Sequence, residues 1–252
     1  MNNNKENSIL AFKEFFNEIN KCKGHSNNGK DFEKNIMNLL ETLNFRSKTW
    51  NSSFALSNID FRDSEKINIK RQILAKNSIE LVNNPNPNIS YIYIYIYIYQ
   101  PFGSQNFPDF LIITKKYILP LEIKFSTKNE KNHLPKWNSN IPKSNCLYIY
   151  SRVNEDVIYF LGSDFIGNDT RCLLNNFFNG FDEEIKEKLN NLKNENKENP
   201  FGLKPYIRKD YTYDKGFCTS KDSKQGIYRY AEINHWKENL LHFLDEISLG
   251  DE

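Results

Sequence analysis

Three charged residues lie in or beside two short apolar segments in the middle of the chain. Asp109 precedes the apolar run 110–114, and Glu122 and Lys124 lie inside the run 117–125. Unpaired charge is costly in an apolar setting, so we expect a reason for its presence there. Two converging carboxylates suit Mg²⁺, which prefers oxygen ligands. A nearby ammonium can stabilise the charge that develops during phosphodiester hydrolysis.

The spacing of Glu122 and Lys124 predicts that both side chains lie on one face of a strand. Residues two apart in a strand point to the same side, so Leu121, Ile123 and Phe125 should face the other way, into the core. The short polar break between the two apolar runs predicts a hairpin. We therefore expect the three charged residues to lie along one edge of that hairpin.

The residue types alone leave a structural alternative open. Glu122 and Lys124 can form a buried or half-exposed ion pair, with Asp109 a turn residue before a strand. Three other acidic-x-Lys triplets occur in the chain, but they lie in charged segments where such spacing is common. The apolar setting, more than the spacing, distinguishes the triplet at Glu122.

The motif as a whole resembles that of a known family. Pro108-Asp109, twelve intervening residues and then Glu122-Ile123-Lys124 resemble the active-site pattern of the PD-(D/E)XK nuclease superfamily. The longer runs GSQNFPDFLI and LEIKFS further resemble type II restriction endonucleases of that superfamily.

This resemblance implies a fold, an activity and a ligand set. It implies a restriction-endonuclease-like α/β core and Mg²⁺-dependent, sequence-specific cleavage of double-stranded DNA. Asp109, Glu122 and the Ile123 carbonyl would hold the metal, and Lys124 would be the catalytic lysine. Many members also carry a glutamate on the first core helix, a place that Glu33 fits. A glutamate in a first helical turn is also favoured by the helix dipole, so both interpretations of Glu33 stay open.

Further polar residues are candidates for contacts with DNA. Gln105 and Asn106 precede the motif, either as groove-contacting amides or as ordinary turn formers. Trp137 either contacts DNA or packs the loop 128–142. A basic and aromatic segment near the C-terminus suits phosphate contact or an exposed surface. The candidates outside the turn are Ser126, Lys128, Lys136, Trp137, Asn138, Arg208, Lys209 and Arg229.

Hydrophobic periodicity predicts an α/β fold with a central mixed β-sheet flanked by helices. We expect one domain over residues 1–252, with a catalytic core at about 29–161. The helical and irregular region 162–252 could hold DNA-recognition or dimerisation elements. Helices are expected at 8–21, 30–44, 67–81, 177–192 and from about Tyr228 or Asn234 to Ile247. Strands are expected at 91–99, 110–114, 117–125, 147–151 and 157–161.

Residues 91–99 alternate strictly between tyrosine and isoleucine. A period of two puts all tyrosines on one face of a strand and all isoleucines on the other. The tyrosine face could contact bases or a partner. Alternatively, the segment is an ordinary strand that buries its isoleucines.

Composition adds few constraints on function. The 252 residues include 34 basic and 32 acidic ones, so net charge gives no reason to propose nucleic-acid binding. Residues 101–150 do hold seven lysines against three acidic residues. Four widely spaced cysteines predict neither disulfides nor a zinc site. No segment is apolar enough for a membrane span or a secretion signal, so we expect a soluble cytoplasmic protein.

Two other functions stay open on the sequence alone. A repair or recombination nuclease could use the same core and recognise DNA structure. A non-catalytic DNA-binding protein could carry the motif as a structural ion pair. A homodimer is expected only because palindromic sites pair with two-fold proteins.

Overall fold

The computed structural model describes most of the chain. The described residues are 8–23, 28–50, 61–75, 81–87, 95–127, 134–138, 141–144, 146–195, 200–205, 210–214, 221–222 and 225–249.

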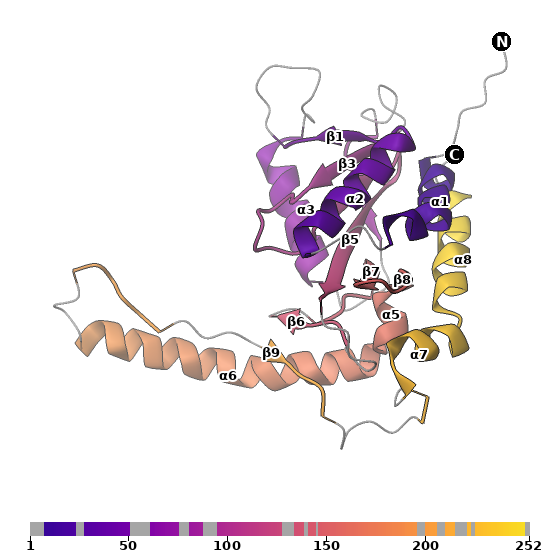
Figure 1. Cartoon of the computed structure of the whole chain (residues 1–252). Coiled ribbons are helices and arrows are strands. Elements are labelled where there is room, and N and C mark those ends of the chain that lie inside the picture. Colours follow the sequence, from indigo (N-terminus) through magenta and orange to yellow (C-terminus); the bar gives the residue numbers. More distant parts are fainter. Residues whose placement is uncertain are drawn as a thin grey trace, which may run out of the picture.

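A mixed sheet forms the centre of the described fold (Figure 1). Its strands run in the order β1-β3-β4-β5-β7-β8, and β2 also pairs with β5. The pairs β1·β3 and β5·β7 are parallel and the others are antiparallel. The strands are β1 (Arg46–Lys48), β2 (Val82–Asn83), β3 (Ile96–Tyr99), β4 (Phe110–Ile113), β5 (Tyr117–Ser126), β7 (Leu147–Arg152) and β8 (Ile158–Leu161).

Helices cover both faces of this sheet, each over its own hydrophobic core. One core contains buried side chains of α1, α2 and α8, and the other contains side chains of α3 and α7. This arrangement confirms the predicted α/β class with a mixed sheet flanked by helices. The helices are α1 (Ser8–Glu18), η1 (Ile19–Cys22), α2 (Gly29–Thr42), α3 (Asp63–Ala75), α5 (Gly162–Phe165), α6 (Asn168–Glu195), α7 (Ile227–Ile233) and α8 (Trp236–Ser248). None of the helices in the described ranges is both long and apolar enough to cross a membrane.

Strand β3 is buried on both faces, which the alternating sequence did not predict. Tyr95 and Tyr97 belong to the core under α1, α2 and α8, whereas Ile96 and Ile98 belong to the core under α3 and α7. Because β3 lies between β1 and β4, its backbone is also paired on both sides. Tyr95 and Tyr97 are therefore core residues, and Tyr99 packs against the same core. Residues 91–94 lie outside the described residues.

Several helices begin or end at residues other than those that the hydrophobic periodicity predicts. The predicted helix 67–81 is α3, which begins at Asp63 and ends at Ala75, and residues 76–80 lie outside the described residues. The predicted helix 177–192 lies inside α6, which begins nine residues earlier, at Asn168, and ends at Glu195. The closing helix is two helices, α7 and α8, because His235 adopts a left-handed backbone with φ 52° between them.

Strand β5 runs through Pro120 without interruption. The β4 ladder pairs Pro120 with Leu111, whereas the β7 ladder begins only at Leu121. The β7 side is therefore open at Pro120, where the Cys146 thiol donates to the Pro120 carbonyl at 3.2 Å. A proline at the end of a ladder removes no bond that the neighbouring strand needs.

A tightly packed corner joins α5 and α6 to the sheet. The buried Arg171 guanidinium donates to the carbonyls of Pro142, Gly162 and Ile166. A Cβ atom at Gly162 would lie 1.9 Å from the Lys143 carbonyl oxygen, so only glycine fits there. This corner fixes the direction in which α6 leaves the sheet.

Candidate active site

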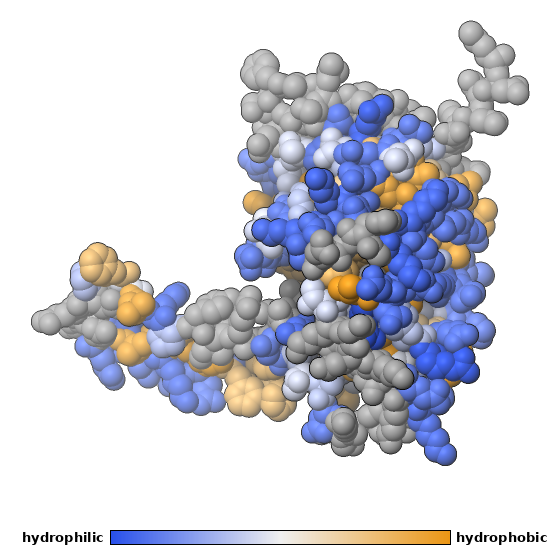
Figure 2. Space-filling model, in the orientation of Figure 1, coloured by the Kyte–Doolittle hydropathy of each residue, from blue (hydrophilic) through white to orange (hydrophobic). Residues whose placement is uncertain are grey.

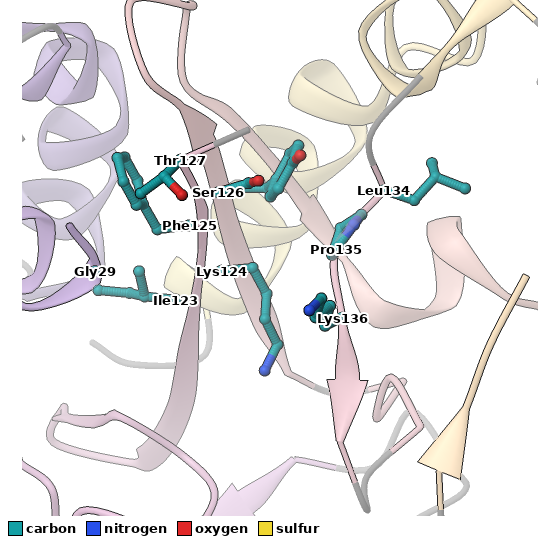
Figure 3. Close-up of a pocket in the computed structure, with 10 residues that line it drawn as sticks. Gly29, Ile123, Lys124, Phe125, Ser126, Thr127, Leu134, Pro135 and Lys136 are labelled. Carbon is teal, nitrogen blue, oxygen red and sulfur yellow. The ribbon is translucent and has the colours of Figure 1, made fainter. Parts of the chain in front are cut away.

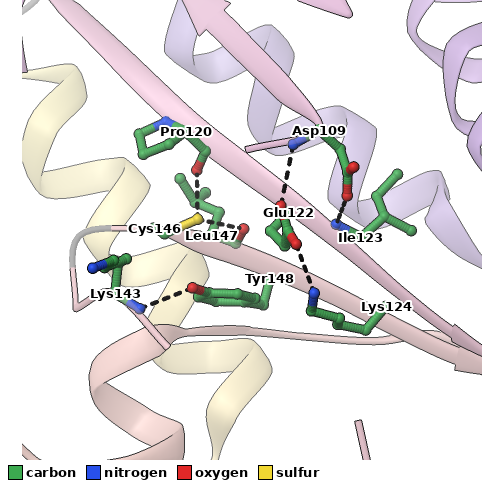
Figure 4. Close-up of polar contacts among 9 residues, drawn as sticks. All are labelled: Asp109, Pro120, Glu122, Ile123, Lys124, Lys143, Cys146, Leu147 and Tyr148. Carbon is green, nitrogen blue, oxygen red and sulfur yellow. Dashed lines mark hydrogen bonds and ion pairs between the residues drawn. The ribbon is translucent and has the colours of Figure 1, made fainter. Parts of the chain in front are cut away.

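The hairpin of β4 and β5 brings the motif residues into direct contact. The ladder pairs Phe110 with Leu121, so Asp109 lies beside the second half of β5. The Ile123 N–H donates to Asp109 Oδ2 at 2.8 Å, and the Asp109 N–H donates to Glu122 Oε2 at 3.2 Å (Figure 4). Two carboxylates therefore meet at the point where the β4 ladder ends.

Lys124 completes the cluster on the same face as Glu122. Its Nζ donates to Glu122 Oε1 at 2.6 Å, and the side chains of Lys124 and Glu122 are 22% and 12% exposed. The ammonium also lies 5.5 Å from the centre of the Trp137 ring. Leu121 and Ile123 are buried on the opposite face, as strand parity predicted. The ion pair itself agrees with both the structural and the catalytic interpretation.

The two carboxylates interact unfavourably. Burial and the neighbouring Glu122 charge raise the pKa of Asp109 from 3.8 to about 8. The bond from the Ile123 N–H and the charge of Lys124 oppose this rise, whereas Glu33 adds to it. One lysine therefore does not supply enough positive charge for both carboxylates to ionise near neutral pH.

Glu33 lies near the pair but is held by other residues. The Tyr99 hydroxyl donates to Glu33 Oε2 at 2.5 Å, and Gln100 Nε2 donates to the Tyr99 oxygen at 2.7 Å. Tyr99 packs against the core on the α2 side of the sheet. Burial and the Glu33 carboxylate raise the Tyr99 pKa. Within the described ranges, no hydrogen bond joins Glu33 to Asp109, which it affects only through its charge.

Tyr99 and Gln100 are therefore site residues that sequence reasoning missed. Tyr99 is the last tyrosine of the repeat, and the Gln100 N–H donates to the Asp109 carbonyl at 2.7 Å. Only its position, ten residues before Asp109 at the end of the repeat, could have indicated from the sequence that Tyr99 belongs to the site. Nothing in the periodicity separates Tyr99 from the buried tyrosines that precede it.

A groove of about 370 Å³ is lined by the second half of β5, from Ile123 onward, and by residues 134–136 (Figure 3). Lys124 on β5 and Lys136, just before β6 (Trp137–Asn138), line opposite walls of it. Ser126 and Thr127 supply hydroxyl groups, although Ser126 is only 7% exposed. Lys124, which pairs with Glu122, therefore connects the cluster to the groove, and Lys136 adds a second ammonium that suits an anionic ligand.

The donors present fit a hard cation held partly by the main chain. Within the described residues, no three His, Cys, Asp or Glu side chains form a metal site by themselves. Asp109 Oδ2 accepts from the Ile123 N–H, and no described residue donates a hydrogen bond to Asp109 Oδ1. The N–H and C=O of one strand residue point to the same edge, so the Ile123 carbonyl also faces Asp109. Two carboxylates and one carbonyl leave positions for water and phosphate.

The remaining candidates are spread over several surfaces. Gln105 and Asn106 are exposed in the turn before β4, where Asn106 Nδ2 donates to the Phe102 carbonyl at 2.7 Å. Trp137 is 4% exposed and packs edge-on against Tyr148, so the structure shows its packing role. Arg229 is exposed on α7, where it forms an ion pair with Glu232 at 2.7 Å. The structure does not describe Lys128, Arg208, Lys209 or the side chain of Asn138.

Trp137 is held in place by a small second sheet. Strand β6 pairs with β9 (Asp210–Tyr211), and the Trp137 indole N–H donates to the Tyr213 hydroxyl. The Tyr213 hydroxyl in turn donates to the Pro135 carbonyl at 2.7 Å. The segment that carries Lys136 is thereby fixed beside the groove.

The chain matches no protein-family model, no curated protein and no solved structure.

Proposed function

We propose that this chain is a Mg²⁺-dependent endonuclease that cleaves double-stranded DNA at specific sequences, of the type II restriction kind. The observation that carries the proposal is the strained carboxylate pair. The Asp109 pKa is raised to about 8 beside Glu122, and no described residue donates a hydrogen bond to Asp109 Oδ1. Such a pair gains stability from a divalent cation, which removes the cause of the repulsion.

The surroundings of the pair favour a phosphate substrate. Lys124 and Lys136 line the groove, and Ser126 and Thr127 line the same groove. A phosphodiester carries one negative charge and several acceptor oxygens, which ammonium and hydroxyl groups recognise. The resemblance of the motif to PD-(D/E)XK nucleases supports DNA as the source of that phosphate. The assignment of the sheet to the restriction-endonuclease-like type also depends on this resemblance.

Each motif residue has a distinct role in this proposal. Asp109, Glu122 and the Ile123 carbonyl would hold the cation, which would activate a water molecule and offset charge on the phosphate. Lys124 stabilises the charge that develops on the phosphate oxygens and orients the attacking water. The Trp137 ring and the Glu122 carboxylate keep its ammonium close to that position. Glu33 acts from the other side of the sheet through its charge.

Digestion of a sequenced plasmid tests the proposal directly. We expect discrete fragments in Mg²⁺, no cleavage in chelator, and no cleavage by Asp109→Asn in either. Asp63→Asn, which removes an exposed carboxylate on α3, should cleave like the unchanged protein. Preference for branched substrates would favour the repair alternative. DNA binding without cleavage in Mg²⁺ or Mn²⁺ would favour the non-catalytic one and reject ours.

The groove makes a separate prediction for DNA affinity. Lys136→Ala should weaken binding to all DNA sequences and lower the salt dependence by about one released counterion. Lys21→Ala, a matched change at an exposed lysine on η1, should leave both unchanged. Fluorescence anisotropy over a salt series in Ca²⁺ measures both quantities without cleavage. If Lys136→Ala and Lys21→Ala change DNA affinity and its salt dependence equally, DNA does not bind in the groove beside Lys136.

A further inference from the structure

Helix α6 projects away from the body of the protein (Figure 1). It has 28 residues and makes no extensive contact with any other described element. Its first turns are anchored by the buried Arg171, and Phe178 contacts Tyr211 of β9 with ring centres 5.3 Å apart. Beyond that point no other described element packs extensively against the helix, although tertiary packing normally stabilises a helix of this length.

The projecting part carries a continuous apolar stripe. Figure 2 shows hydrophobic residues gathered along this helix. Phe181 and Leu192 are 45% and 38% exposed, and Ile185 and Leu189 lie between them, half-buried by neighbouring residues. Monomeric proteins rarely expose contiguous apolar surface of this kind, so the stripe indicates an interface.

Charge on the helix argues against an anionic partner. Residues 182–195 contain five acidic and three basic residues. DNA and acidic membrane surfaces are recognised by a basic excess, which this segment lacks. A protein partner with both charge signs fits better.

The stripe is symmetric about Ile185. Phe181 and Leu189 lie four residues to either side of it, and Phe178 and Leu192 lie seven residues to either side. At 3.6 residues per turn, these five positions fall within an arc of about 80°. A stripe with this spacing is complementary to itself when a second helix runs in the opposite direction.

We propose that two copies of this chain associate through antiparallel α6 helices, with the two-fold axis beside Ile185. Ile185 then meets its own copy, Phe181 meets Leu189 of the second chain, and Phe178 meets Leu192. The interface is isologous, the usual form for a homodimer. This inference is independent of the proposed nuclease activity.

The residues that flank the stripe support this register. On one flank, Asp182 lies within about 3 Å, along the helix axis, of Lys186 of the second copy. On the other flank, Glu184 lies at the same offset from Lys188 of the second copy. Within one chain, Lys188 pairs with Glu184 at 2.7 Å, so its ammonium already lies beside the stripe. A parallel arrangement would instead place Asp182 beside Glu184 of the second copy, which brings like charges together.

Disulfide trapping tests the register. In a Cys172→Ser, Cys218→Ser background, Ile185→Cys should give a cross-linked dimer under mild oxidation. Phe178→Cys alone should not, because its two copies lie about 21 Å apart along the axis. A mixture of Phe178→Cys and Leu192→Cys chains should cross-link. Self-linking of Phe178→Cys would overturn the antiparallel arrangement.

Sedimentation velocity over a concentration series tests the association itself. The unchanged protein should be a dimer, and Ile185→Glu should weaken it by about a hundredfold or more, because two carboxylates then face each other. Asn190→Glu adds the same charge on the opposite face of α6 and should leave the dimer intact. Mixing Ile185→Glu with Ile185→Lys should restore it. Circular dichroism checks that every variant keeps its helix content.

Two results would overturn the proposal. One is a monomer at every concentration of the unchanged protein. The other is a dimer that Ile185→Glu leaves intact. If the protein is monomeric and Ile185→Glu instead weakens DNA binding, the stripe covers DNA and not a second chain.

Discussion

Magnesium and a proton should compete for the Asp109 carboxylate. Its pKa is raised from 3.8 to about 8 by burial and by the Glu122 charge. Between about pH 4 and 8, the folded chain therefore holds a proton that the unfolded chain has released. The stability of the metal-free protein should fall as pH rises through that window. A bound cation must displace the proton, so its affinity should rise with pH until about 8.

The size of the effect follows from the position of that pKa. At pH 6.5 only about 3% of the Asp109 carboxylates are ionised. The apparent Mg²⁺ affinity should then be about thirtyfold weaker than at pH 9, a difference of about 2 kcal/mol. Below pH 8 the affinity should change by about tenfold per pH unit.

Calorimetry in two buffers with different ionisation enthalpies measures both affinity and proton release. We expect about one proton released per Mg²⁺ at pH 6.5 and close to none at pH 9. Glu122→Gln removes the charge that raises the Asp109 pKa, so the pH above which Mg²⁺ affinity stops rising should be lower. The Mg²⁺ affinity above that pH should also be weaker, because one ligand has lost its charge. Asp63→Asn should change neither. Equal affinity at pH 6.5 and 9, without proton release, would refute the reasoning about Asp109.

Three further predictions concern separate parts of the structure, and the last compares two glycine variants. Lys124→Met keeps the aliphatic stem but not the charge, so cleavage should fall by about 100- to 1000-fold while Mg²⁺ binding, followed by calorimetry, persists. Tyr99→Phe removes the donor to Glu33 and should lower the free energy of unfolding in urea by about 2 kcal/mol. Gly162→Ala places a methyl group against a main-chain carbonyl and should cost about 3 kcal/mol, whereas Gly180→Ala on open α6 should stabilise by up to about 1 kcal/mol, both measured by thermal denaturation.

Each of these has a result that would contradict it. If the Lys124→Met variant cleaves DNA as fast as the unchanged protein, the ion pair of Lys124 with Glu122 has a structural role only. An unchanged urea midpoint for the Tyr99 variant would mean that water replaces its hydroxyl. Equal stability of the two glycine variants would mean that the corner at Gly162 relaxes.

The local geometry of the site was predictable because strand parity is a short-range rule. Glu122 and Lys124 had to share a face once β5 formed, and a two-lysine break was enough to predict the hairpin. The approach of Asp109 to Glu122 followed from the same hairpin. These predictions needed only residues that are neighbours in the sequence.

The environment of the site depended on contacts between distant segments. Tyr99 and Glu33 are 66 residues apart, and no periodicity links them. The raised pKa of Asp109 follows from burial, which depends on how helices close over both faces of the sheet. Likewise, Trp137 packs against Phe165 on α5, and its strand pairs with β9, some seventy residues later. Patterns within one segment carry no signal for such contacts.

The tyrosine and isoleucine repeat at residues 91–99 allows the chain before β3 to change in length without changing the residues of β3. Removing or adding one Tyr-Ile unit upstream of Tyr95 leaves every residue from Tyr95 to Tyr99 of the same type. The contacts of Tyr97 with Glu41 and of Tyr99 with Glu33 would then re-form unchanged. A loss or gain of a single residue between Tyr95 and Tyr99 would instead exchange the two faces of the strand. The gene segment that encodes this strand can therefore vary by whole dipeptide units without altering the core beside the active site.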